Sequence, residues 1–550
     1  MDGSVTDMSL IISGLLEHGA ENFGDTEVVT REVDGSIQRY GYADANVRAK
    51  RLASTLARRG VGAASRVATL AWNTRRHFEM FYAAPGIGAL LHTVNPRLSA
   101  EHLVYIINDA RDEYLFVDPQ TITMAEQIAA QLWSVHTYVF MGEKNEMPTT
   151  TLPNLLNYEA LVAEGDAAFE WPDLDERTPA VVCYTSGTTG QPKGVVYTHR
   201  SIVLQSFMGN MFNLPGTTNG ERQVLLALAP MFHATAWNFP FIGPLIGAKI
   251  VFPGRNMEPE KIYELLEQEQ VTRAGGVPSI WVILTDWMEA NGKQFSSLKH
   301  AIGAGSTVSQ SVIQSLLDKG LEVYQTWGMT EIPHASSGLL KPGHDQLSSA
   351  EQLRYRSKSG RAIYGMRLKL VDDAGKTLPR DGVTAGHLRV KGLWAAASYL
   401  NKPEVQALDE QGWMITGDIA TIDQHGYMQL VDRSKDVIKS GGEWISSVEL
   451  EKAALGHPEV AQAAVIAVPH RKWLERPLLL VVRREGASVD AASLLAFMRP
   501  LIARWWLPDA VEFVDSLPMT GVGKLDKRSL RAAYADYRLN DAAQPKDAAR

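Results

Sequence analysis

Residues 184–194 combine hydroxyl groups, glycines and a lysine in a pattern that could bind phosphate. The segment reads Tyr-Thr-Ser-Gly-Thr-Thr-Gly-Gln-Pro-Lys-Gly and follows the apolar run 180–183, which predicts a strand. Hydroxyl and backbone donors can bind phosphate oxygens, and glycines allow the positive φ and the close approach that such a loop needs. The candidate phosphate ligands are Thr185, Ser186, Gly187, Thr188, Thr189, Gly190 and Lys193.

This loop does not match the loop of P-loop NTPases. That pattern needs Gly, four residues and then Gly-Lys-Ser/Thr, whose hydroxyl holds Mg²⁺. Here Pro192 precedes the lysine and Gly194 follows it, so the hydroxyl is missing from its place. An ordinary polar turn does not account for the unbroken run of Thr, Ser and Gly before Pro-Lys-Gly. We therefore interpret the segment as a phosphate loop of another class.

The composition excludes several classes of protein. The chain has 550 residues, of which 45% are hydrophobic and 21% charged, and its formal net charge is -8. These values argue against disorder, collagen and coiled coil, and the length predicts more than one folding unit. No long basic run is present, so we expect no nucleic-acid partner. The N-terminus lacks a basic and apolar leader, which favours a cytoplasmic location.

Two further features narrow the chemistry. Cys183 is the single cysteine, so disulfides and cysteine-based metal sites are excluded, and we interpret it as a small core residue. Residues 224–248 contain no Asp, Glu, Lys or Arg, but they include three prolines and a histidine. A membrane-spanning helix would not be built in this way, so this stretch predicts buried core and no transmembrane segment.

Helices and strands alternate along most of the chain. Residues 43–59 have apolar positions at helical spacing and are followed by a short apolar strand at 66–72. The same unit recurs from Pro259, which suits the first turn of a helix, and is followed by a strand near residue 273. This alternation predicts an α/β fold with a mostly parallel sheet.

The sequence texture changes after about residue 430. Residues 432–446 are dense in charge and glycine, and helices at 447–455 and 491–499 then alternate with strands at 460–468 and 510–514. This length is sufficient for a small α+β domain.

The loop at 184–194 resembles the signature loop of the acyl-adenylate-forming superfamily, which includes acyl-CoA synthetases, adenylation domains and luciferases. Further blocks match family blocks in the same order: AWNTRRHFEMFYAAPGIGALLHTVNPRL, PMFHATAW, YQTWGMTE, GWMITGDIA, DRSKDVIKSGGEWISSVELE and PMTGVGKLDKRSLR. The segment IKSGGEWISSVELE is most similar to bacterial medium- and long-chain fatty acyl-CoA synthetases and methylthiopropionate-CoA ligases. The resemblance implies a large multilayer N-terminal domain (1–431) with sheets flanked by helices, a hinge (432–436) and a small mobile α+β C-terminal domain (437–550).

The resemblance also implies a reaction in two steps. A carboxylate attacks the α-phosphate of ATP to give acyl-AMP and pyrophosphate, and the thiol of coenzyme A then displaces AMP. Both reactants of the first step are anions, so the site must screen charge and align the attack, which Mg²⁺ and lysines can do.

Most of the implied nucleotide site lies in the large domain. Glu331 resembles the family's Mg²⁺-binding glutamate, and one carboxylate with ATP oxygens and water makes a sound magnesium site. Thr330 resembles the residue that binds the α-phosphate, Trp327 the aromatic that stacks on adenine, and Thr185 a further ligand of metal or phosphate. The remaining positions of this expected nucleotide site are Gly305, Gln325, Thr326 and Gly328.

The rest of the implied machinery surrounds the hinge and the small domain. Asp418 and Arg433 resemble the two ribose contacts, and Lys524 resembles the lysine that bridges the carboxylate and the α-phosphate. Rotation at the hinge, centred on Lys435, would remove Lys524 and bring another segment to the site for the thioester step. That segment's expected hinge, CoA and adenylate contacts are Lys439, Gly441, Gly442, Glu443 and Trp444.

The acyl pocket is where the resemblance is least specific. His233 resembles a residue lining the acyl and thioester site, and Trp237 resembles the gate of a fatty-acid tunnel. Gly303, Ala304 and Gly305 resemble the backbone that lines adenine and acyl group. Thr326 and Ala304 stand where relatives carry smaller residues, and His334 adds polarity, so we expect a short- or medium-chain, branched or aryl-alkanoic acid.

Three other functions are compatible with parts of this pattern. A free-standing adenylation enzyme would pass the acyl group to a carrier protein. An ATP-dependent phosphotransferase or ATPase would release ADP or phosphate, and a nucleotide-binding regulator would not need both Lys524 and Glu331. For an acid–CoA ligase, which is the main hypothesis, the expected partners are a small-molecule carboxylic acid, ATP and coenzyme A. The resemblance also implies a homodimer.

Overall fold

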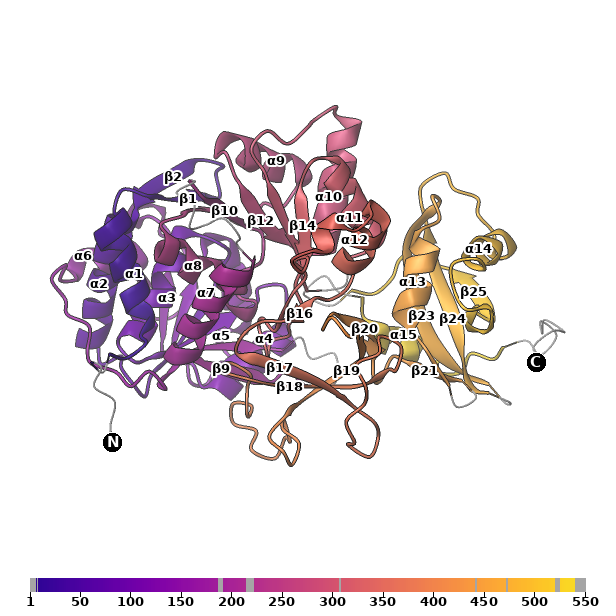
Figure 1. Ribbon diagram of the computed structural model, residues 1–550. Coiled ribbons are helices and arrows are strands. Elements are labelled where there is room, and N and C mark those ends of the chain that lie inside the picture. Colours follow the sequence, from indigo (N-terminus) through magenta and orange to yellow (C-terminus); the bar gives the residue numbers. More distant parts are fainter. Residues whose placement is uncertain are drawn as a thin grey trace. The chain divides into compact units, whose positions relative to one another are not determined.

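The computed structural model describes residues 6, 8–185, 191–213, 222–305, 308–440, 443–470, 473–519 and 525–539, without the side chains of 210–213, 443 and 444. These residues divide into two compact units (Figure 1). The described residues of Met1–Thr185, Pro192–Arg367 and Lys391–Met414 form the first unit. The described residues of Leu368–Val390 and Ile415–Arg550 belong to the second unit. The predicted hinge at 432–436 lies within the second unit, and its movement stays a prediction.

Two seven-stranded sheets form the frame of the first unit, within the described residues. Parallel pairs dominate both sheets, and β2 and β9 are antiparallel edge strands. The order in one sheet is β14 (Glu322–Gln325), β13 (His300–Gly303), β12 (Arg273–Gly276), β10 (Val224–Ala227), β11 (Lys249–Phe252), β1 (Glu27–Arg31) and β2 (Ile37–Gly41). The order in the other is β7 (Leu155–Asn157), β6 (Thr137–Phe140), β5 (Tyr114–Val117), β3 (Arg66–Leu70), β4 (Leu90–Val94), β8 (Pro179–Tyr184) and β9 (Gly194–Thr198).

Each sheet buries both of its faces, which gives the unit five layers. Neighbouring residues of one strand enter different cores, because side chains alternate across a strand. Val28 and Val67 pack in a core shared by both sheets, whereas Val29 and Ala68 pack in the two outer cores. The middle layer holds α1 (Ile12–Phe23), α2 (Tyr42–Arg58), α3 (Arg75–Gly86), α6 (Tyr158–Glu164), α7 (His199–Asn213) and α8 (Phe239–Ile246). The outer layers hold α9 (Pro259–Gln268), α10 (Pro278–Ala290) and α11 (Gln310–Asp318) on one side, and α4 (Ala100–Ala110) and α5 (Ile122–Ala129) on the other.

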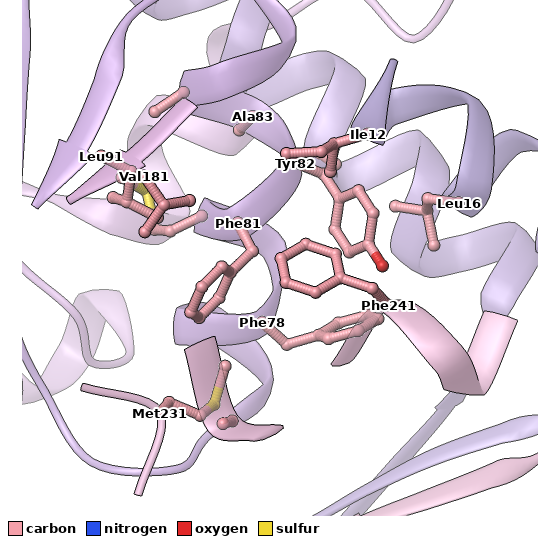
Figure 2. Close-up of a cluster of buried hydrophobic side chains, with 14 of the residues drawn as sticks. Ile12, Leu16, Phe78, Phe81, Tyr82, Ala83, Leu91, Val181, Met231 and Phe241 are labelled. Atoms are coloured by element: carbon pink, nitrogen blue, oxygen red, sulfur yellow. The ribbon is translucent and has the colours of Figure 1, made fainter. Parts of the chain in front are cut away.

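Aromatic side chains fill the centre of the middle layer. Figure 2 shows Phe78, Phe81 and Tyr82 of α3 gathered around Phe241 of α8. The rings of Phe81 and Phe241 meet edge to face at 5.4 Å, a geometry that the ring quadrupoles favour. The Tyr82 hydroxyl donates to the Pro240 carbonyl at 2.6 Å, so its polar group is satisfied inside the core.

The structure confirms the helices and strands expected from periodicity. The helix expected at 43–59 is α2, the strand at 66–72 is β3, and the helix from Pro259 is α9. The uncharged stretch 224–248 forms β10, a short turn and α8, and most of it is buried, as predicted. No described helix is long and apolar enough to cross a membrane.

The second unit combines two sheets with helices. One sheet has the order β17 (Met366–Val371), β18 (Gly386–Gly392), β19 (Met414–Ile422) and β20 (Met428–Arg433). The other contains β22 (Glu443–Ile445), β21 (Ile438–Ser440), β24 (Leu474–Arg483), β23 (Val460–His470) and β25 (Ala510–Phe513). The expected helices are α13 (Ser447–Leu455) and α14 (Ala491–Met498), and a further helix, α15 (Lys527–Ala533), follows. The α+β character expected of the C-terminal region is confirmed.

A histidine–aspartate pair is fully buried beside the strand that leads into the phosphate loop. His92 on β4 and Asp112 after α4 are 2.6 Å apart, between Nδ1 and Oδ2. Burial raises the pKa of the Asp112 carboxyl, and His92 opposes this. A His92→Leu variant would leave that carboxyl buried without its partner, so we expect urea-induced unfolding to show a loss of about 3 kcal/mol or more. In the double variant His92→Leu/Asp112→Leu neither side chain of the pair remains buried without its partner, so the free energy of unfolding should partly recover. A His92→Leu variant as stable as the parent would contradict this account.

Candidate active site

The described ends of the phosphate loop form the base of a hairpin. β8 ends at Tyr184, β9 begins at Gly194, and the two residues are paired in antiparallel register. The Thr185 backbone N–H donates to the Lys193 carbonyl at 2.9 Å, and the Lys193 N–H donates to the Thr185 hydroxyl at 3.1 Å. The strand expected before the loop is therefore confirmed, and Thr185 and Lys193 are neighbours. The predicted ligands Ser186, Gly187, Thr188, Thr189 and Gly190 lie outside the described residues.

Thr330 and Glu331 lie at the tip of a tight turn after β14. Met329 and Ile332 exchange backbone hydrogen bonds of 2.9 Å in each direction, which fixes the two residues between them. Gly328 is required at the base of this turn, because a Cβ there would lie 2.5 Å from the Pro333 carbonyl oxygen. Trp327 is buried, and its backbone N–H donates to the Ser336 hydroxyl at 3.1 Å.

Two tyrosines connect this turn with the phosphate loop. The Tyr197 hydroxyl donates to the Thr330 carbonyl at 2.5 Å, and the Tyr399 hydroxyl donates to Glu331 Oε1 at 2.7 Å. The Lys193 ammonium lies 4.9 Å from the centre of the Tyr399 ring. Lys193, Thr330 and Glu331, which are far apart in the sequence, are therefore brought together.

The segment expected to line adenine ends the neighbouring strand. Gly303 is the last residue of β13, and its carbonyl accepts the Thr326 N–H at 2.9 Å. Gly305 has a φ of +85°, which favours glycine. The Gln325 side chain accepts from the Val308 N–H at 3.3 Å and donates to the Arg356 carbonyl at 3.1 Å, so it supports the loops from within.

The expected acyl residues include a run of left-handed backbone. Ala234, Thr235, Ala236, Trp237 and Asn238 all have φ between 34° and 64°, a region that costs free energy for residues other than glycine. Asn238 holds the turn in place, because its amide donates to the Ser206 hydroxyl at 3.0 Å. This conformation was not foreseen from the sequence.

The left-handed turn places the Trp237 indole over two strand ends. A Cβ on Gly275, the third residue of β12, would lie 3.3 Å from the ring, and one on Gly305 would lie 3.9 Å from it. His233, which begins the turn, is half-buried. The Trp237 ring, Gly305 and the end of β12 therefore share one region, and the role of Trp237 in an acyl pocket stays a prediction.

His334 is buried next to α7. A Cβ on Gly209 of that helix would lie 3.7 Å from His334 Nδ1. Burial lowers the pKa of His334 to about 4, so the imidazole is neutral at physiological pH. Ala304 is also buried, whereas Thr326 is half-buried.

The two expected ribose contacts are paired in the second unit. Asp418 and Arg433 face each other in the antiparallel register of β19 and β20. Asp418 Oδ1 lies 2.8 Å from Arg433 Nε, and the carboxylate is almost fully buried. The guanidinium also donates to the Thr416 carbonyl at 3.2 Å. The sequence predicted both residues, and the structure brings them together.

The ends of the predicted hinge are each bound to helices of the second unit. Asp432 Oδ2 accepts from the Ser447 N–H at 2.7 Å, and the Lys527 ammonium donates to the Ser447 hydroxyl at 2.6 Å. Asp436 forms an ion pair with Arg531. Burial lowers the pKa of Lys435, which lies between them.

The remaining expected residues of this unit are only partly described. Lys439 is exposed on β21, its N–H donates to Glu475 Oε2 at 2.7 Å, and Trp444 lies opposite in register on β22. Lys524, Gly441 and Gly442 lie outside the described residues. The first residue of α15 is Lys527, three positions after Lys524.

Comparison with known proteins assigns the family. Residues 16–400 match the model of the AMP-binding enzyme, and residues 449–524 match that of the AMP-binding enzyme C-terminal domain. The chain belongs to the AMP-binding enzyme family.

Relatives in this family match over nearly the whole chain. The 3-methylmercaptopropionyl-CoA ligase of Ruegeria lacuscaerulensis is 44% identical, covering 98% of this chain and 99% of the relative. The medium-chain-fatty-acid–CoA ligase of Ectopseudomonas oleovorans is 40% identical, covering 99% of each. The anthranilate CoA ligase AuaEII in complex with anthranoyl-AMP shares the fold, with a TM-score of 0.84 at 23% identity over 97% of this chain and 99% of that one.

Tyr197 and Tyr399 contact the predicted site residues Thr330 and Glu331, and sequence reasoning missed both of them. Tyr197 could have been found from strand alternation, since it lies on β9 two residues after the buried Val195. Tyr399 lies in a loop, and nothing in the sequence connects it with Glu331, which is 68 positions away.

The donors on this AMP-binding enzyme suit Mg²⁺. No group of three or more His, Cys, Asp or Glu side chains that could hold a metal alone occurs among the described residues. Mg²⁺ commonly takes one or two carboxylates with phosphate oxygens and water. Glu331 supplies one such carboxylate, near the Lys193 and Thr330 expected to bind phosphate, so the residues present fit the ion.

Proposed function

We propose that this chain is an AMP-forming acid–CoA ligase. It converts a carboxylic acid and ATP into acyl-AMP and pyrophosphate, and then transfers the acyl group to coenzyme A with release of AMP. The observation that carries this proposal is the grouping of Lys193, Thr330 and Glu331 in a chain whose full-length relatives are CoA ligases.

The residues would divide the work as follows. Lys193 and Thr185 hold phosphate oxygens at the base of the loop, and the paired Asp418 and Arg433 hold the ribose hydroxyls, since a carboxylate is an acceptor for them. Glu331 would hold Mg²⁺, which screens the phosphate charge when bound. Lys524 would neutralise charge between the carboxylate and the α-phosphate, and a fixed positive charge at that point lowers the barrier.

We infer that the acid is short or medium in length, branched or aryl-alkanoic. The Trp237 indole lies against Gly275 and Gly305. Ala304, which precedes Gly305 in the chain and is buried, adds a methyl group to the segment expected to line the acyl group. His334, which burial keeps neutral by lowering its pKa to about 4, adds polarity without a charge. The relative named 3-methylmercaptopropionyl-CoA ligase supports an acid that is short and partly polar.

A screen of CoA-dependent AMP release tests both parts of this proposal. We expect kcat/KM for 3-methylmercaptopropanoate, hexanoate or phenylpropanoate to exceed that for palmitate at least tenfold, because each misfitting methylene costs about 1–3 kcal/mol in a filled pocket. A higher value for palmitate would contradict the proposed acid but not the ligase activity. Release of ADP or phosphate would contradict the ligase activity itself. Acid-dependent pyrophosphate exchange without any acyl-CoA would favour the carrier-protein alternative.

We also propose that the enzyme acts as a homodimer in the cytoplasm. Family resemblance supports the homodimer. Light scattering on the purified protein would test the first part, and fractionation of the producing cell would test the second.

A further inference from the structure

A short segment of the first unit binds three parts of the nucleotide site together. Residues 396–402, here called the strap, follow β18 in the chain. The Ala396 N–H donates to the Glu331 carbonyl at 2.8 Å, and the Leu400 N–H donates to the Gly194 carbonyl at 2.8 Å. The strap is thereby joined both to the turn that carries Glu331 and to the strand that leaves the phosphate loop.

The far end of the strap is anchored on α4. The Asn401 amide donates to the Asp109 carbonyl at 2.6 Å, and the Lys402 ammonium lies 3.3 Å from Asp109 Oδ1. The other oxygen of that carboxylate accepts from the Tyr184 hydroxyl at 2.8 Å, on the strand entering the loop. The strap is therefore held at both strands of the phosphate-loop hairpin.

Tyr399 lies at the centre of the strap, and its hydroxyl group and its aromatic ring each contact a predicted site residue. Its hydroxyl donates to Glu331 Oε1 at 2.7 Å, and within the described residues it is the one side chain that donates to this carboxylate. Its ring lies 4.9 Å from the Lys193 ammonium.

We propose that Tyr399 is the positioning residue for Mg²⁺·ATP. Its hydroxyl fixes one oxygen of Glu331 and so directs the other toward the metal, while its ring holds Lys193 beside the same phosphates. This inference rests on the proposed function for the role of Glu331. Groups that bond to a metal-ligating carboxylate typically change metal affinity 10–100-fold when removed.

Two substitutions separate the two roles of Tyr399. Tyr399→Phe removes the hydroxyl and keeps the ring, so binding of Mn²⁺·ATP, measured by calorimetry without acid, should weaken 10–100-fold. Tyr399→Leu also removes the contact with Lys193 and should weaken binding of ATP without metal about two- to fivefold, an effect absent in Tyr399→Phe. For the phenylalanine variant, KM for Mg²⁺·ATP should rise, while KM for the acid and conversion of supplied acyl-AMP to acyl-CoA stay unchanged.

Tyr263 provides a matched control. It is half-buried, its hydroxyl donates to the Gln294 carbonyl at 3.0 Å, and the Lys293 ammonium lies 6.0 Å from its ring. Tyr263→Phe therefore loses the same kind of contact in an outer layer and should bind Mn²⁺·ATP as the parent does. If Tyr399→Phe binds equally well, the inference is overturned.

A double variant distinguishes an effect of Tyr399 that acts through Glu331 from a general loss of structure. In a Glu331→Gln background the carboxylate is already absent, so adding Tyr399→Phe should change Mn²⁺·ATP binding less than twofold. An undiminished loss in that background, or a parallel loss of acyl-AMP conversion, would show that Tyr399 serves folding and would overturn the inference. Because these binding measurements need no acid, failure of the acid screen leaves them interpretable and counts only against the proposed function.

Discussion

Replacing Lys524 with alanine is expected to lower acyl-AMP formation about 10²–10³-fold, the effect of removing one preorganised charge-stabilising group. The acid and ATP are both anionic, and this lysine is the proposed positive group between them. The thioester step should survive, because it begins from acyl-AMP and needs no bridge to the α-phosphate. Acid-dependent pyrophosphate exchange measures the first step, and conversion of supplied acyl-AMP to acyl-CoA measures the second.

The comparison of half-reactions makes this test specific. Lys376 is an exposed lysine of the same unit, so Lys376→Ala should leave both steps unchanged. Equal losses of both half-reactions in Lys524→Ala would contradict the proposal that the small domain presents different residues in the two steps. A split between them would support movement at the predicted hinge.

The contacts around the hinge give this movement a structural context. Asp432 accepts a hydrogen bond from Ser447, which in turn accepts one from Lys527 of α15. Asp436 forms an ion pair with Arg531 of the same helix. That helix begins three residues after Lys524. The helix that follows Lys524 is therefore bound to the segment about which the small domain is proposed to turn. These links join distant positions through single side chains, and no periodicity in the sequence reports them.

The fold was predictable wherever one local pattern determined the structure. The apolar spacing at 43–59 gave α2, and the short run at 66–72 gave β3, because burial of one helix stripe or of both strand faces is specified residue by residue. Asp418 and Arg433 were chosen as ribose contacts from family motifs rather than from periodicity, and their ion pair was not predicted. The order of strands in the two sheets was not predicted, since it depends on contacts across more than a hundred residues.

The site was less predictable where the backbone leaves ordinary conformations. The left-handed run from Ala234 to Asn238 contains a β-branched residue and no glycine, so local propensity argues against it. Packing of Asn238 on α7 and of Trp237 over Gly275 holds it in place. Tyr399 was missed for a related reason, because its role depends on a loop folding back onto Glu331 and Lys193.

The second large effect is expected at Glu331 itself. Glu331→Gln keeps the size of the side chain and an oxygen that can accept from Tyr399, but it removes the negative charge from a nearly buried position. Loss of the charge should lower kcat/KM for Mg²⁺·ATP about 10²–10³-fold, more than Tyr399→Phe, because the ligand is lost rather than merely misdirected. Acyl-AMP formation across a range of Mg²⁺ concentrations measures this.

The comparison with an exposed glutamate decides whether the effect is local. Glu289 pairs with Lys319 at the surface, so Glu289→Gln removes one charge from the same unit without touching the site and should leave kcat/KM unchanged. In Glu331→Gln, raising Mg²⁺ should recover part of the activity, and conversion of supplied acyl-AMP should be spared. If kcat/KM of Glu331→Gln lies within threefold of the parent value, Glu331 is not part of the metal site, and the hydrogen bond from Tyr399 has no role in placing the metal. A large loss that Mg²⁺ partly restores would show that the turn at 329–332, the strap and the phosphate loop act in the same step of the reaction.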